Sequence, residues 1–532
     1  MSRGLVLVLV LCLSPALASL GDELMDVDPA QYADVAARIV SSGDWLHLED
    51  MNGPFINKPP LVLWAEALAM EVLGPTSLAA RLPALGFALL AVLGTFFLGL
   101  ELADRRLGAL AAALLAGSVA VHLGVADPKV DLALAAMTTW AIGAAVAARR
   151  RPRWMVLAWL FAGLAVLTKG PVGLGIVLLA LVPELSRGVS SGLPGERLRA
   201  TGRHLVGVAL FVAVVLPFYA SQNPDAARYL LWTQGFGRLL GGGDFHDTTT
   251  PLFFVHTGLW ALLPMTPLLI AALARGVTRL RRERTLPPDV RRVPAWWFGL
   301  TFLVISFSAF KLPQYLYWLA PPAALLAADE LLRWHDETLG RWRTGYLALS
   351  VGAAALALGL LAFAFPPPAA LAAGLGAASL LPALAWWLAR KEERALRMGA
   401  LAASSCVGFF AIFHAWLHPS LLEFQPWREV GAAVQSLPSG APVLLVDVPK
   451  TFALSFYARR TLRPASREDV AAEAPARFVV SAQSFEALRS AGAPVESVRR
   501  LPLYPVSLPR GPFLRASTRE TQLEWLVVAQ WR

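Results

Sequence analysis

The sequence predicts a mainly α-helical, polytopic membrane protein with about thirteen transmembrane helices and a small α/β domain at its C-terminal end. Three observations predict this class. Of the 532 residues, 56% are hydrophobic and 16% are charged, whereas soluble globular domains carry about 25% charged residues. Long uncharged runs recur from the N-terminus to about residue 417. Arginines gather in the short loops between these runs, as they do in the cytoplasmic loops of membrane proteins.

The apolar runs give the candidate spans, because a helix needs roughly 20 apolar residues to cross a bilayer. Several of the runs are short, and they lie near residues 4–20, 79–102, 107–125, 131–148, 154–168, 170–185, 204–221, 251–274, 295–310, 313–330, 344–364, 368–389 and 398–417. The first run follows Arg3 and ends in small residues, which is typical of a cleavable signal peptide. We favour an uncleaved signal anchor, and both interpretations place the chain outside the cytoplasm from Asp22 onward.

Charge in the loops assigns the two sides of the membrane. With the N-terminus inside, the arginine-rich loops at 103–106, 149–153, 187–203, 275–292, 331–343 and 390–397 all fall on the cytoplasmic side. The segments at 21–78, 126–130, 169, 222–250, 311–312 and 365–367 fall outside and carry far fewer cations. This agreement with the positive-inside rule predicts an inner (plasma) membrane protein with both residues 21–78 and its C-terminal part outside the cytoplasm.

The composition changes near residue 418. Short apolar runs at 443–446, 478–480 and 525–528 alternate with helical patterns at 427–436 and 483–491. Strands that alternate with helices indicate a small α/β domain. We therefore divide the chain into a transmembrane part, residues 1–417, and an extracytoplasmic domain, residues 418–532.

The net charge of +10 does not indicate a nucleic-acid partner, because loop position accounts for the cations. The two cysteines, Cys12 and Cys406, both lie in apolar runs, which suits neither a metal cluster nor a disulfide framework. Asp244, His246 and Asp247 are potential metal ligands in one loop, but ligands so close in sequence converge poorly. We expect a solvated polar loop there, and we expect no required cofactor, although a divalent metal stays an open alternative.

The first outside segment carries the most information. Residues 29–41 have helical spacing, with Tyr32, Val35 and Ile39 on one face, and they follow Asp28. An aspartate at that point is a helix N-cap by default. An amphipathic helix of this kind is expected to lie along the membrane surface.

Four blocks of sequence give the chain a family resemblance. They are Asp28 and Tyr32 followed by Ser42-Gly43-Asp44-Trp45; Asn52-Gly53 with Lys58-Pro59-Pro60-Leu61 and Trp64; Leu167-Thr168-Lys169-Gly170-Pro171; and Ser308-Ala309-Phe310-Lys311-Leu312-Pro313-Gln314-Tyr315. In this order and spacing they resemble the GT-C membrane glycosyltransferases of the family 39 type. The closest groups are the lipid A aminoarabinose transferases and the bacterial relatives of protein O-mannosyltransferases. The resemblance covers the membrane part, whereas the C-terminal domain matches only in placement and size.

The resemblance implies a GT-C-like fold and an enzyme of the cell envelope. Such an enzyme moves a hexose or pentose from a polyprenyl-phosphate (undecaprenyl phosphate) donor to an extracytoplasmic acceptor, with inversion. The acceptor is a glycolipid, as in lipid A modification, a polysaccharide, or a protein, as in protein O-mannosylation. We expect a monomer in the lipid bilayer that uses no nucleic acid.

The acidic candidates are Asp28, Asp131 and Asp127. Asp28 matches the family's first acidic residue, and a carboxylate there can take the proton of an acceptor hydroxyl or orient the acceptor. Relatives carry a second Asp at the start of a helix, roughly forty residues before Thr168-Lys169-Gly170. Asp131 fits that spacing better, and Asp127 is an alternative that could instead cap the helix, with Pro128 in its first turn.

The basic candidates for the donor phosphate are Lys58, Lys311, Lys169 and Arg238. Lys58 and Lys311 lie at outside membrane boundaries beside prolines, where ammonium groups can stabilise a departing phosphate or simply extend to the interface. Lys169 lies between two short apolar runs, and its two interpretations are evenly balanced. Arg238 is in the outside loop that contacts donor or acceptor in relatives.

Tyr32, Tyr315 and Gln31 are the expected residues of the substrate cavity. Gln31 departs from the family pattern, because the aminoarabinose transferases carry Arg at that position. The missing cation weakens the case for an acceptor as rich in phosphate as lipid A.

Two other classes of protein remain as alternatives. A transporter or flippase would place ionisable residues near the bilayer midplane, often in repeated halves, whereas here they lie at the ends of spans. A catalytically inactive assembly or sensor protein would present residues 418–532, and the retained Asp28, Lys58 and Lys311 argue against it. The sequence therefore favours an enzyme.

Overall fold

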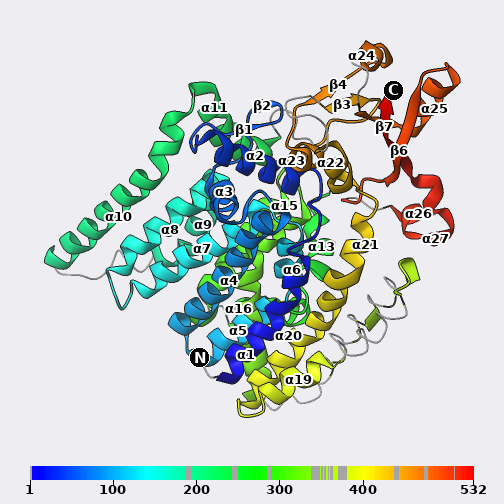
Figure 1. Ribbon diagram of the computed structural model, residues 1–532. Coiled ribbons are helices and arrows are strands. Elements are labelled where there is room, and N and C mark those ends of the chain that lie inside the picture. The colour runs from blue at the N-terminus through cyan, green and yellow to red at the C-terminus, as the bar shows by residue number, and fades with distance from the viewer. Residues whose placement is uncertain are drawn as a thin grey trace.

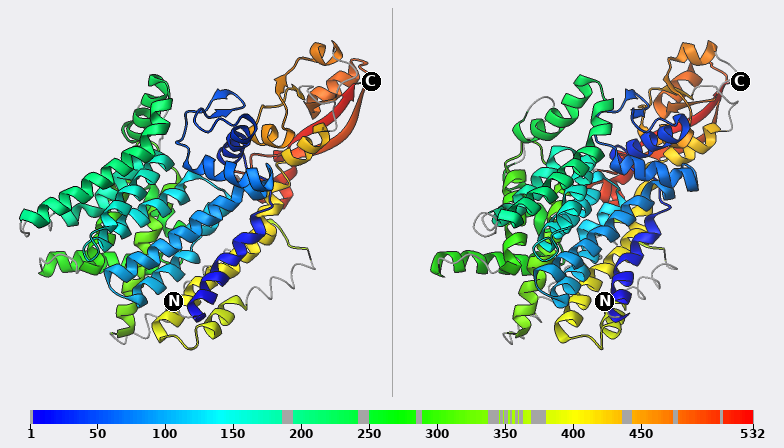
Figure 2. Two further views of the ribbon diagram at one scale, coloured as in Figure 1. Left: turned by 60° about the vertical axis from the view of Figure 1, so that its left-hand side comes forward. Right: turned by 90° about the vertical axis from the view of Figure 1, so that its left-hand side faces the viewer.

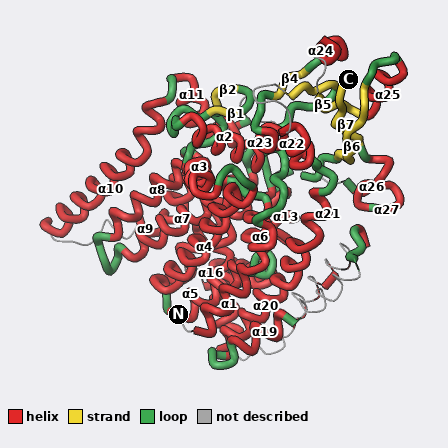
Figure 3. The backbone as a smooth tube through the Cα atoms, viewed as in Figure 1, coloured by secondary structure: helices red, strands yellow, loops and turns green. Residues whose placement is uncertain are grey.

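The structure is a computed structural model, and it describes residues 3–185, 194–241, 250–283, 289–336, 380–435, 443–472, 477–507 and 510–531, with some residues between 345 and 368. Helices make up the membrane part, and strands are confined to a short hairpin near the N-terminus and to the C-terminal sheet (Figure 3). The hairpin and the sheet lie at one end of the molecule, and the N-terminus lies toward the other end (Figure 1).

The helices of the membrane part follow one another with short connections. They are α1 (Arg3–Leu13), α4 (Ser77–Leu102), α5 (Arg105–Ala116), α6 (Val119–Ala126), α7 (Val130–Ala147), α8 (Trp154–Lys169), α9 (Pro171–Leu185), α10 (Pro194–Ser221), α11 (Pro224–Arg228), α12 (Arg238–Leu240), α13 (Phe253–Ala261), α14 (Thr266–Glu283), α15 (Asp289–Ser306), α16 (Ala320–Asp336), α19 (Leu381–Leu388), α20 (Arg394–Ile412) and α21 (His418–Leu422). A π-helical stretch, Tyr229–Gly237, and a 3₁₀ stretch, Pro313–Leu319, precede α12 and α16.

Local sequence fixes where several of these helices begin and bend. The carboxylate of Asp104 accepts a hydrogen bond from the Leu107 amide at 3.0 Å and so caps α5, because an N-cap oxygen satisfies an amide that lacks a helical partner. Gly117 separates α5 from α6, which meet at a 46° bend. A Cβ at Gly117 would come within 2.5 Å of the Ala403 carbonyl oxygen, so α20 approaches the chain closely at this bend.

Within the described residues, four helices are long and apolar enough to cross a membrane, and α5 with α6 makes a fifth candidate. The four are α4, α7, Thr201–Ser221 of α10, and Leu396–Leu422, which joins α20 to α21. The predicted spans at 4–20, 154–168 and 170–185 are shorter apolar helices, and the predicted span at 251–274 is divided into α13 and α14. The predicted spans at 344–364 and 368–389 fall largely outside the described residues, so the count of thirteen stays a prediction.

The N-terminal helix packs into the membrane part. Leu5, Val8 and Leu9 of α1 belong to the main apolar core. That packing favours the interpretation of residues 4–20 as a retained anchor helix.

The outer segment, residues 21–78, contains the expected surface helix. This helix, α2 (Asp28–Ser42), ends at Gly43, whose φ of +71° provides a left-handed C-cap. The expectation that Asp28 caps the helix is wrong: Val27 is the N-cap residue, and no side chain makes a capping bond. The hairpin of β1 (Glu49–Asp50) and β2 (Gly53–Pro54) follows α2, and α3 (Leu61–Leu73) follows Pro60.

The C-terminal region contains a five-stranded sheet in the order β4-β3-β5-β7-β6. β4 (Leu462–Pro464), β3 (Val443–Val446) and β5 (Arg477–Ser481) are parallel, whereas β7 (Glu524–Trp531) and β6 (Val495–Leu503) pair antiparallel. The helices are α22 (Trp427–Gln435), α23 (Phe452–Ala458), α24 (Arg467–Ala472), α25 (Ala482–Ser490), α26 (Gly511–Leu514) and α27 (Ala516–Arg519).

The predicted strands and helices of this region are present, as β3, β5, β7, α22 and α25. The sequence analysis missed β4, β6 and α23. β6 is mostly exposed at the edge of the sheet and carries Glu496, Arg499 and Arg500, and charge on an edge strand hides the apolar alternation that identifies strands.

The C-terminal region packs directly on the outer segment, so these two parts lie on the same side of the molecule (Figure 2). The amide of Leu24 donates to the Tyr457 hydroxyl at 2.7 Å, and the Gln425 side-chain amide donates to the Leu24 carbonyl at 2.8 Å. Helix α21 carries the chain past residue 417 to Leu422. The division at 417/418 itself stays a prediction.

Candidate active site

Helix α2 presents Asp28 in its first turn, where the positive end of the helix dipole favours a carboxylate. The side chain is half-buried. Within the described residues, no hydrogen-bond or ion-pair partner lies within reach of this carboxylate. Asp28 is therefore an acidic group whose oxygens are available to another molecule.

Lys58 lies in the turn between β2 and α3, followed by Pro59 and Pro60. Its ammonium donates to the neighbouring Asn57 carbonyl at 3.2 Å, and no carboxylate of a described residue lies within ion-pair distance. Burial lowers the pKa of Lys58 to about 7, because a poorly solvated site disfavours the charged form.

Asp131 and Lys169 form a buried ion pair between the start of α7 and the end of α8. The indole nitrogen of Trp318 donates to the same Asp131 oxygen at 2.9 Å. The Lys169 ammonium also lies 4.5 Å from the ring centres of both Tyr315 and Trp318, which is a favourable cation–π distance. The pair is thus held by two aromatic rings from the segment that precedes α16.

Arg238 belongs to the loop between α10 and α13, and two contacts orient it. Its guanidinium donates to the Tyr315 hydroxyl at 3.3 Å and lies 5.2 Å from the Phe310 ring centre. The amides of Ala309 and Phe310 donate to the Leu239 and Arg238 carbonyls at 3.1 and 3.2 Å. These bonds hold the Ser308–Tyr315 block against the Arg238 loop, and Lys311 is buried within that block.

Electrostatic interactions connect these groups into one cluster. After burial, the charge of Arg238 also lowers the pKa of Lys58, Asp28 raises it, Lys169 lowers it and Asp131 raises it. Burial raises the pKa of Tyr32 in α2, and Asp28 and Asp131 raise it further. We call Asp28, Lys58, Asp131, Lys169 and Arg238 the charged cluster, and Tyr32 and Tyr315 border it.

A pocket with a volume of about 210 Å³ opens beside the charged cluster. Lys169, Arg238, Tyr315 and Trp318 line it together with apolar side chains. Those apolar residues are Pro171, Val172, Ile176, Leu179, Phe236, Leu239, Val304 and Ile305. Cations beside an apolar pocket can hold a molecule with an anionic head and a hydrocarbon tail.

The structure separates the two aspartates that the sequence left as alternatives. Asp131 is in the charged cluster, whereas Asp127 pairs with Lys129 at 2.7 Å. The expectation that Asp127 caps α7 is wrong, because α7 begins at Val130 with Lys129 as its N-cap residue. Asp127 is instead the C-cap residue of α6.

Gln31 does not join the charged cluster through its hydrogen bond. Its side-chain amide donates to the Asp50 carboxylate of β1 at 2.7 Å, so it holds the hairpin against α2. The potential metal ligands Asp244, His246 and Asp247 lie outside the described residues, and no group of three metal-binding side chains occurs among the described residues.

Two residues of the site had not been selected from the sequence. Trp318 binds Asp131, and Phe310 lies against Arg238. Both belong to or directly follow the fourth sequence block, and Trp318 stands three residues after Tyr315. That spacing was the available signal, because side chains three apart share a face of a helical stretch.

Comparison with known proteins places this arrangement in context. Residues 57–220 match a family model described as "Dolichyl-phosphate-mannose-protein mannosyltransferase"; this region contains Lys58, Asp131 and Lys169. The chain is 27% identical over 342 residues to an undecaprenyl phosphate-alpha-4-amino-4-deoxy-L-arabinose arabinosyl transferase of Aeromonas salmonicida, covering 61% of this chain and 60% of that protein. A Pseudomonas fluorescens protein of the same description is also 27% identical, over 64% of this chain and 59% of its own length. The chain thus spans about three fifths of the length of these relatives.

Solved structures give the fold. ArnT from Cupriavidus metallidurans, in a crystal structure with bound undecaprenyl phosphate, matches with a TM-score of 0.73 at 20% identity, over 98% of this chain and 97% of that chain. The oligosaccharyltransferase AglB from Archaeoglobus fulgidus matches with a TM-score of 0.52 at 13% identity, over 88% of this chain and 65% of that chain. The chain therefore has the GT-C membrane fold. The transporter alternative finds no support among these similar proteins.

Proposed function

We propose that this chain, an integral membrane protein that has the GT-C fold and is similar in sequence to undecaprenyl-phosphate aminoarabinose transferases, transfers a sugar from a polyprenyl-phosphate carrier to an acceptor outside the cytoplasm. One observation carries the proposal. An available carboxylate, Asp28, shares a site with Lys58, Lys169 and Arg238 beside an apolar pocket. An acid, several cations and an apolar pocket are what such a transfer requires.

In the proposed reaction, an acceptor hydroxyl attacks the anomeric carbon of the sugar. The new carbon–oxygen bond forms as the bond to the carrier phosphate breaks, and the phosphate keeps the electron pair. Asp28 accepts the hydroxyl proton, as a general base within reach of the nucleophile. Attack from the side opposite the leaving phosphate inverts the configuration at the anomeric carbon.

The cations bind and stabilise the carrier phosphate. Lys58 has no paired carboxylate among the described residues, so its full charge is available to the donor. Lys169 is already paired with Asp131, which makes it a weaker phosphate ligand and assigns Asp131 the role of positioning it. The apolar pocket lined by Ile176, Val304 and Ile305 accommodates the first part of the polyprenyl chain, because apolar surface there leaves water.

The donor and acceptor are proposed from the relatives. A polyprenyl-phosphate pentose, such as undecaprenyl phosphate-linked 4-amino-4-deoxy-L-arabinose, is the first donor to test, because the relatives are named for it. A glycolipid is the first acceptor to test. Gln31 replaces a cation of those relatives, so we expect an acceptor with fewer phosphates than lipid A.

The proposed transfer needs no metal ion, because Lys58 and Arg238 supply positive charge for the leaving phosphate. Purified protein treated with a strong chelator should keep its transfer rate. Loss of transfer after chelation, with recovery on adding Mg²⁺ or Mn²⁺, would show that a metal shares this role.

We also propose that the site faces the extracytoplasmic side of the inner membrane. α7 has Asp131 at its first turn and arginines just beyond its other end, and α8 begins after Arg153 and ends at Lys169. The arginine-rich ends belong inside by the positive-inside rule, which leaves the charged cluster outside. All residues of the cluster come from one chain, so we propose a monomer, which light scattering of the detergent-solubilised protein tests.

The decisive experiment replaces Asp28. With purified protein and radiolabelled donor, Asp28→Asn should lower kcat by about 100-fold or more, the usual contribution of a general base. Donor binding, measured separately, should change little. Asp44→Asn is the matched control, because Asp44 is an exposed carboxylate of the same outer segment that pairs with His47. Transfer by Asp28→Asn at the wild-type rate would remove Asp28 from the reaction.

A further inference from the structure

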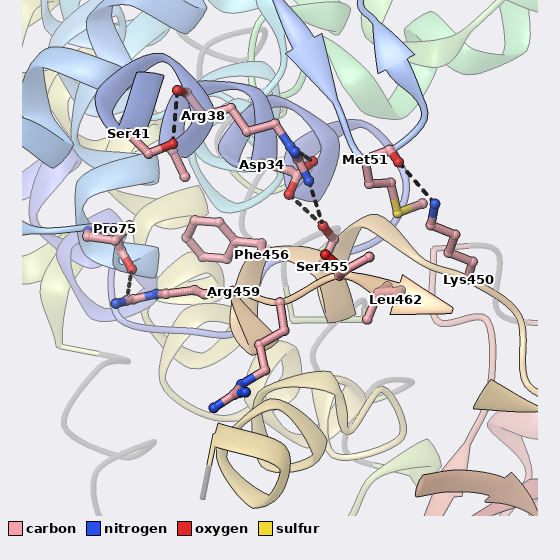
Figure 4. A pocket seen from close by; sticks show the side chains of 13 residues that line it. Asp34, Arg38, Ser41, Met51, Pro75, Lys450, Ser455, Phe456, Arg459 and Leu462 are labelled. Atoms are coloured by element: carbon pink, nitrogen blue, oxygen red, sulfur yellow. Dashed lines mark hydrogen bonds and ion pairs between the residues drawn. The ribbon is translucent and has the colours of Figure 1, made fainter. Parts of the chain in front are cut away.

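A second, larger pocket lies between α2 and the C-terminal domain (Figure 4). Its volume is about 690 Å³, within the usual range of roughly 300–1,000 Å³ for small-molecule sites. Asp34 and Arg38 of α2 form one wall, and Lys450, Ser455 and Arg459 of the C-terminal domain form the other. We call it the interdomain pocket.

The interdomain pocket is separate from the charged cluster. Asp34, Arg38 and Ser41 recur at spacings of four and three residues, so they share one face of α2. Asp28 and Tyr32 also stand four residues apart, but at roughly 100° per residue they face a different side of the helix. One helix thus presents the proposed reaction site on one face and the interdomain pocket on another.

Positive charge dominates the lining of the interdomain pocket. Four cations, Arg38, Lys450, Arg459 and Arg460, accompany one carboxylate, Asp34. Arg38 pairs with Asp34 at 3.0 Å, and the Ser455 hydroxyl also donates to Asp34 at 2.7 Å. Asp34 is therefore already occupied and can balance only one of the four charges.

Lys450 and Arg459 have only neutral partners in the described part of the chain. Lys450 donates to the Met51 carbonyl at 3.0 Å, and Arg459 donates to the Pro75 carbonyl at 2.6 Å. No carboxylate of a described residue lies within 4 Å of either group. These carbonyls hold the two side chains on opposite sides of the pocket without cancelling their charge (Figure 4). An anion placed between them would gain charge-assisted hydrogen bonds.

The size and the remaining groups of the pocket narrow the ligand further. An inorganic anion would fill a small part of about 690 Å³. Ser41 and Thr461, both exposed, add hydroxyls that can bind other hydroxyls. We propose that the interdomain pocket binds an anionic saccharide, a sugar that carries a phosphate or a carboxylate, and that this sugar belongs to the acceptor. The second half of this inference rests on the proposed function, whereas the binding itself does not.

Direct binding tests the site on the full-length protein in detergent. The probes are glucose 1-phosphate, glucuronic acid, glucose and inorganic phosphate, titrated by calorimetry. We expect each charged sugar to bind at least about tenfold more tightly than glucose and than inorganic phosphate. A preference for only one of the charged sugars identifies the anion as phosphate or carboxylate. Equal binding of the charged sugars and glucose, or of sugar phosphate and inorganic phosphate, would overturn the proposal.

Variants locate the binding in the pocket. The double variant Lys450→Gln with Arg459→Gln should raise the Kd of the charged sugars about tenfold or more, whereas Arg459→Lys should keep most of the affinity because it keeps the charge. Arg467→Gln is the matched control, since Arg467 is an exposed cation of α24 outside the pocket. Thermal unfolding of each variant checks the fold. Unchanged binding by a folded double variant would place the ligand elsewhere and overturn the assignment.

The two proposals can fail separately. Asp28→Asn should bind the charged sugars as the wild type does, even though it does not transfer. If the wild type transfers a sugar but the double variant keeps its KM for the acceptor, the assignment of the pocket to the acceptor is wrong. If charged sugars bind but no sugar is transferred from any polyprenyl-phosphate donor, the proposed function fails and the binding site stands.

Discussion

At the scale of single residues, the distinctive group is Lys58. Most lysines stay charged far above neutral pH, but burial and the nearby cations lower the pKa of Lys58 to about 7. Its ammonium is thus present in only part of the molecules at neutral pH. A bound phosphate would raise this pKa again, because an opposite charge favours the ammonium form.

This pKa predicts how donor affinity depends on pH. As pH rises through about 7, the free enzyme loses the Lys58 charge, so KM for the donor should rise between about pH 6 and pH 8.5. Lys58→Arg should remove most of this dependence, because a guanidinium stays charged throughout that range. Steady-state kinetics at fixed ionic strength measure the effect. A donor KM with the same pH profile in both proteins would contradict the phosphate role of Lys58.

At the scale of elements, close packing of small residues joins α4 to α5. A Cβ at Gly99 of α4 would lie 2.6 Å from the Gly108 Cα of α5, which is closer than two carbon atoms can approach. Small residues at helix contacts allow such close approach within membranes. The contact matters for the site because α4 and α5 lead through α6 to the turn before α7, which carries Asp131.

A pair of glycine substitutions in α4 tests this contact. Gly99→Ala forces the two helices apart and should destabilise the protein by about 1–3 kcal/mol. Gly86→Ala is the control on the same helix, because a Cβ at Gly86 meets nothing within 4 Å and alanine favours helix formation. Thermal unfolding in one detergent compares them. Equal unfolding temperatures for the two variants would mean that α4 and α5 do not pack in this way.

At the scale of the whole molecule, a network of hydrogen bonds joins the outer segment to the C-terminal domain. The amide of Arg428 donates to the Glu23 carboxylate at 3.0 Å, and the amide of Ala453 donates to the Asp26 carboxylate at 3.1 Å. Burial raises the pKa of Glu23 from 4.5 to about 8 and that of Asp26 to about 6. These carboxyl groups therefore hold protons in the folded protein that they release when it unfolds near neutral pH.

The direction of these shifts predicts how stability depends on pH. The folded state binds more protons than the unfolded state between pH 4.5 and about 8, so stability is greatest at the acidic end and falls as pH rises through this window. Glu23→Gln should reduce the loss, because an amide cannot ionise. Glu423→Gln is the control at an exposed carboxylate of the same region. Unfolding temperatures of Glu23→Gln that fall with pH as steeply as those of the wild type would contradict this role.

The sequence by itself determined the class of fold, the helix α2, the strands β3, β5 and β7, and the blocks that contain the charged cluster. These features depend on local periodicity and composition, which are visible along the chain. It also selected Asp28, Lys58 and Lys169, because charges at the ends of apolar runs stand out.

Only the tertiary structure decided which groups meet. It paired Asp131 with Lys169 and Asp127 with Lys129, and it turned Gln31 toward Asp50. Lys169 and Asp131 lie on different helices, so their contact depends on how α7 and α8 pack, and the pattern within either helix carries no record of it. For the same reason the interdomain pocket could not be foreseen: it exists because α2 and α23, more than four hundred residues apart in the chain, pack side by side.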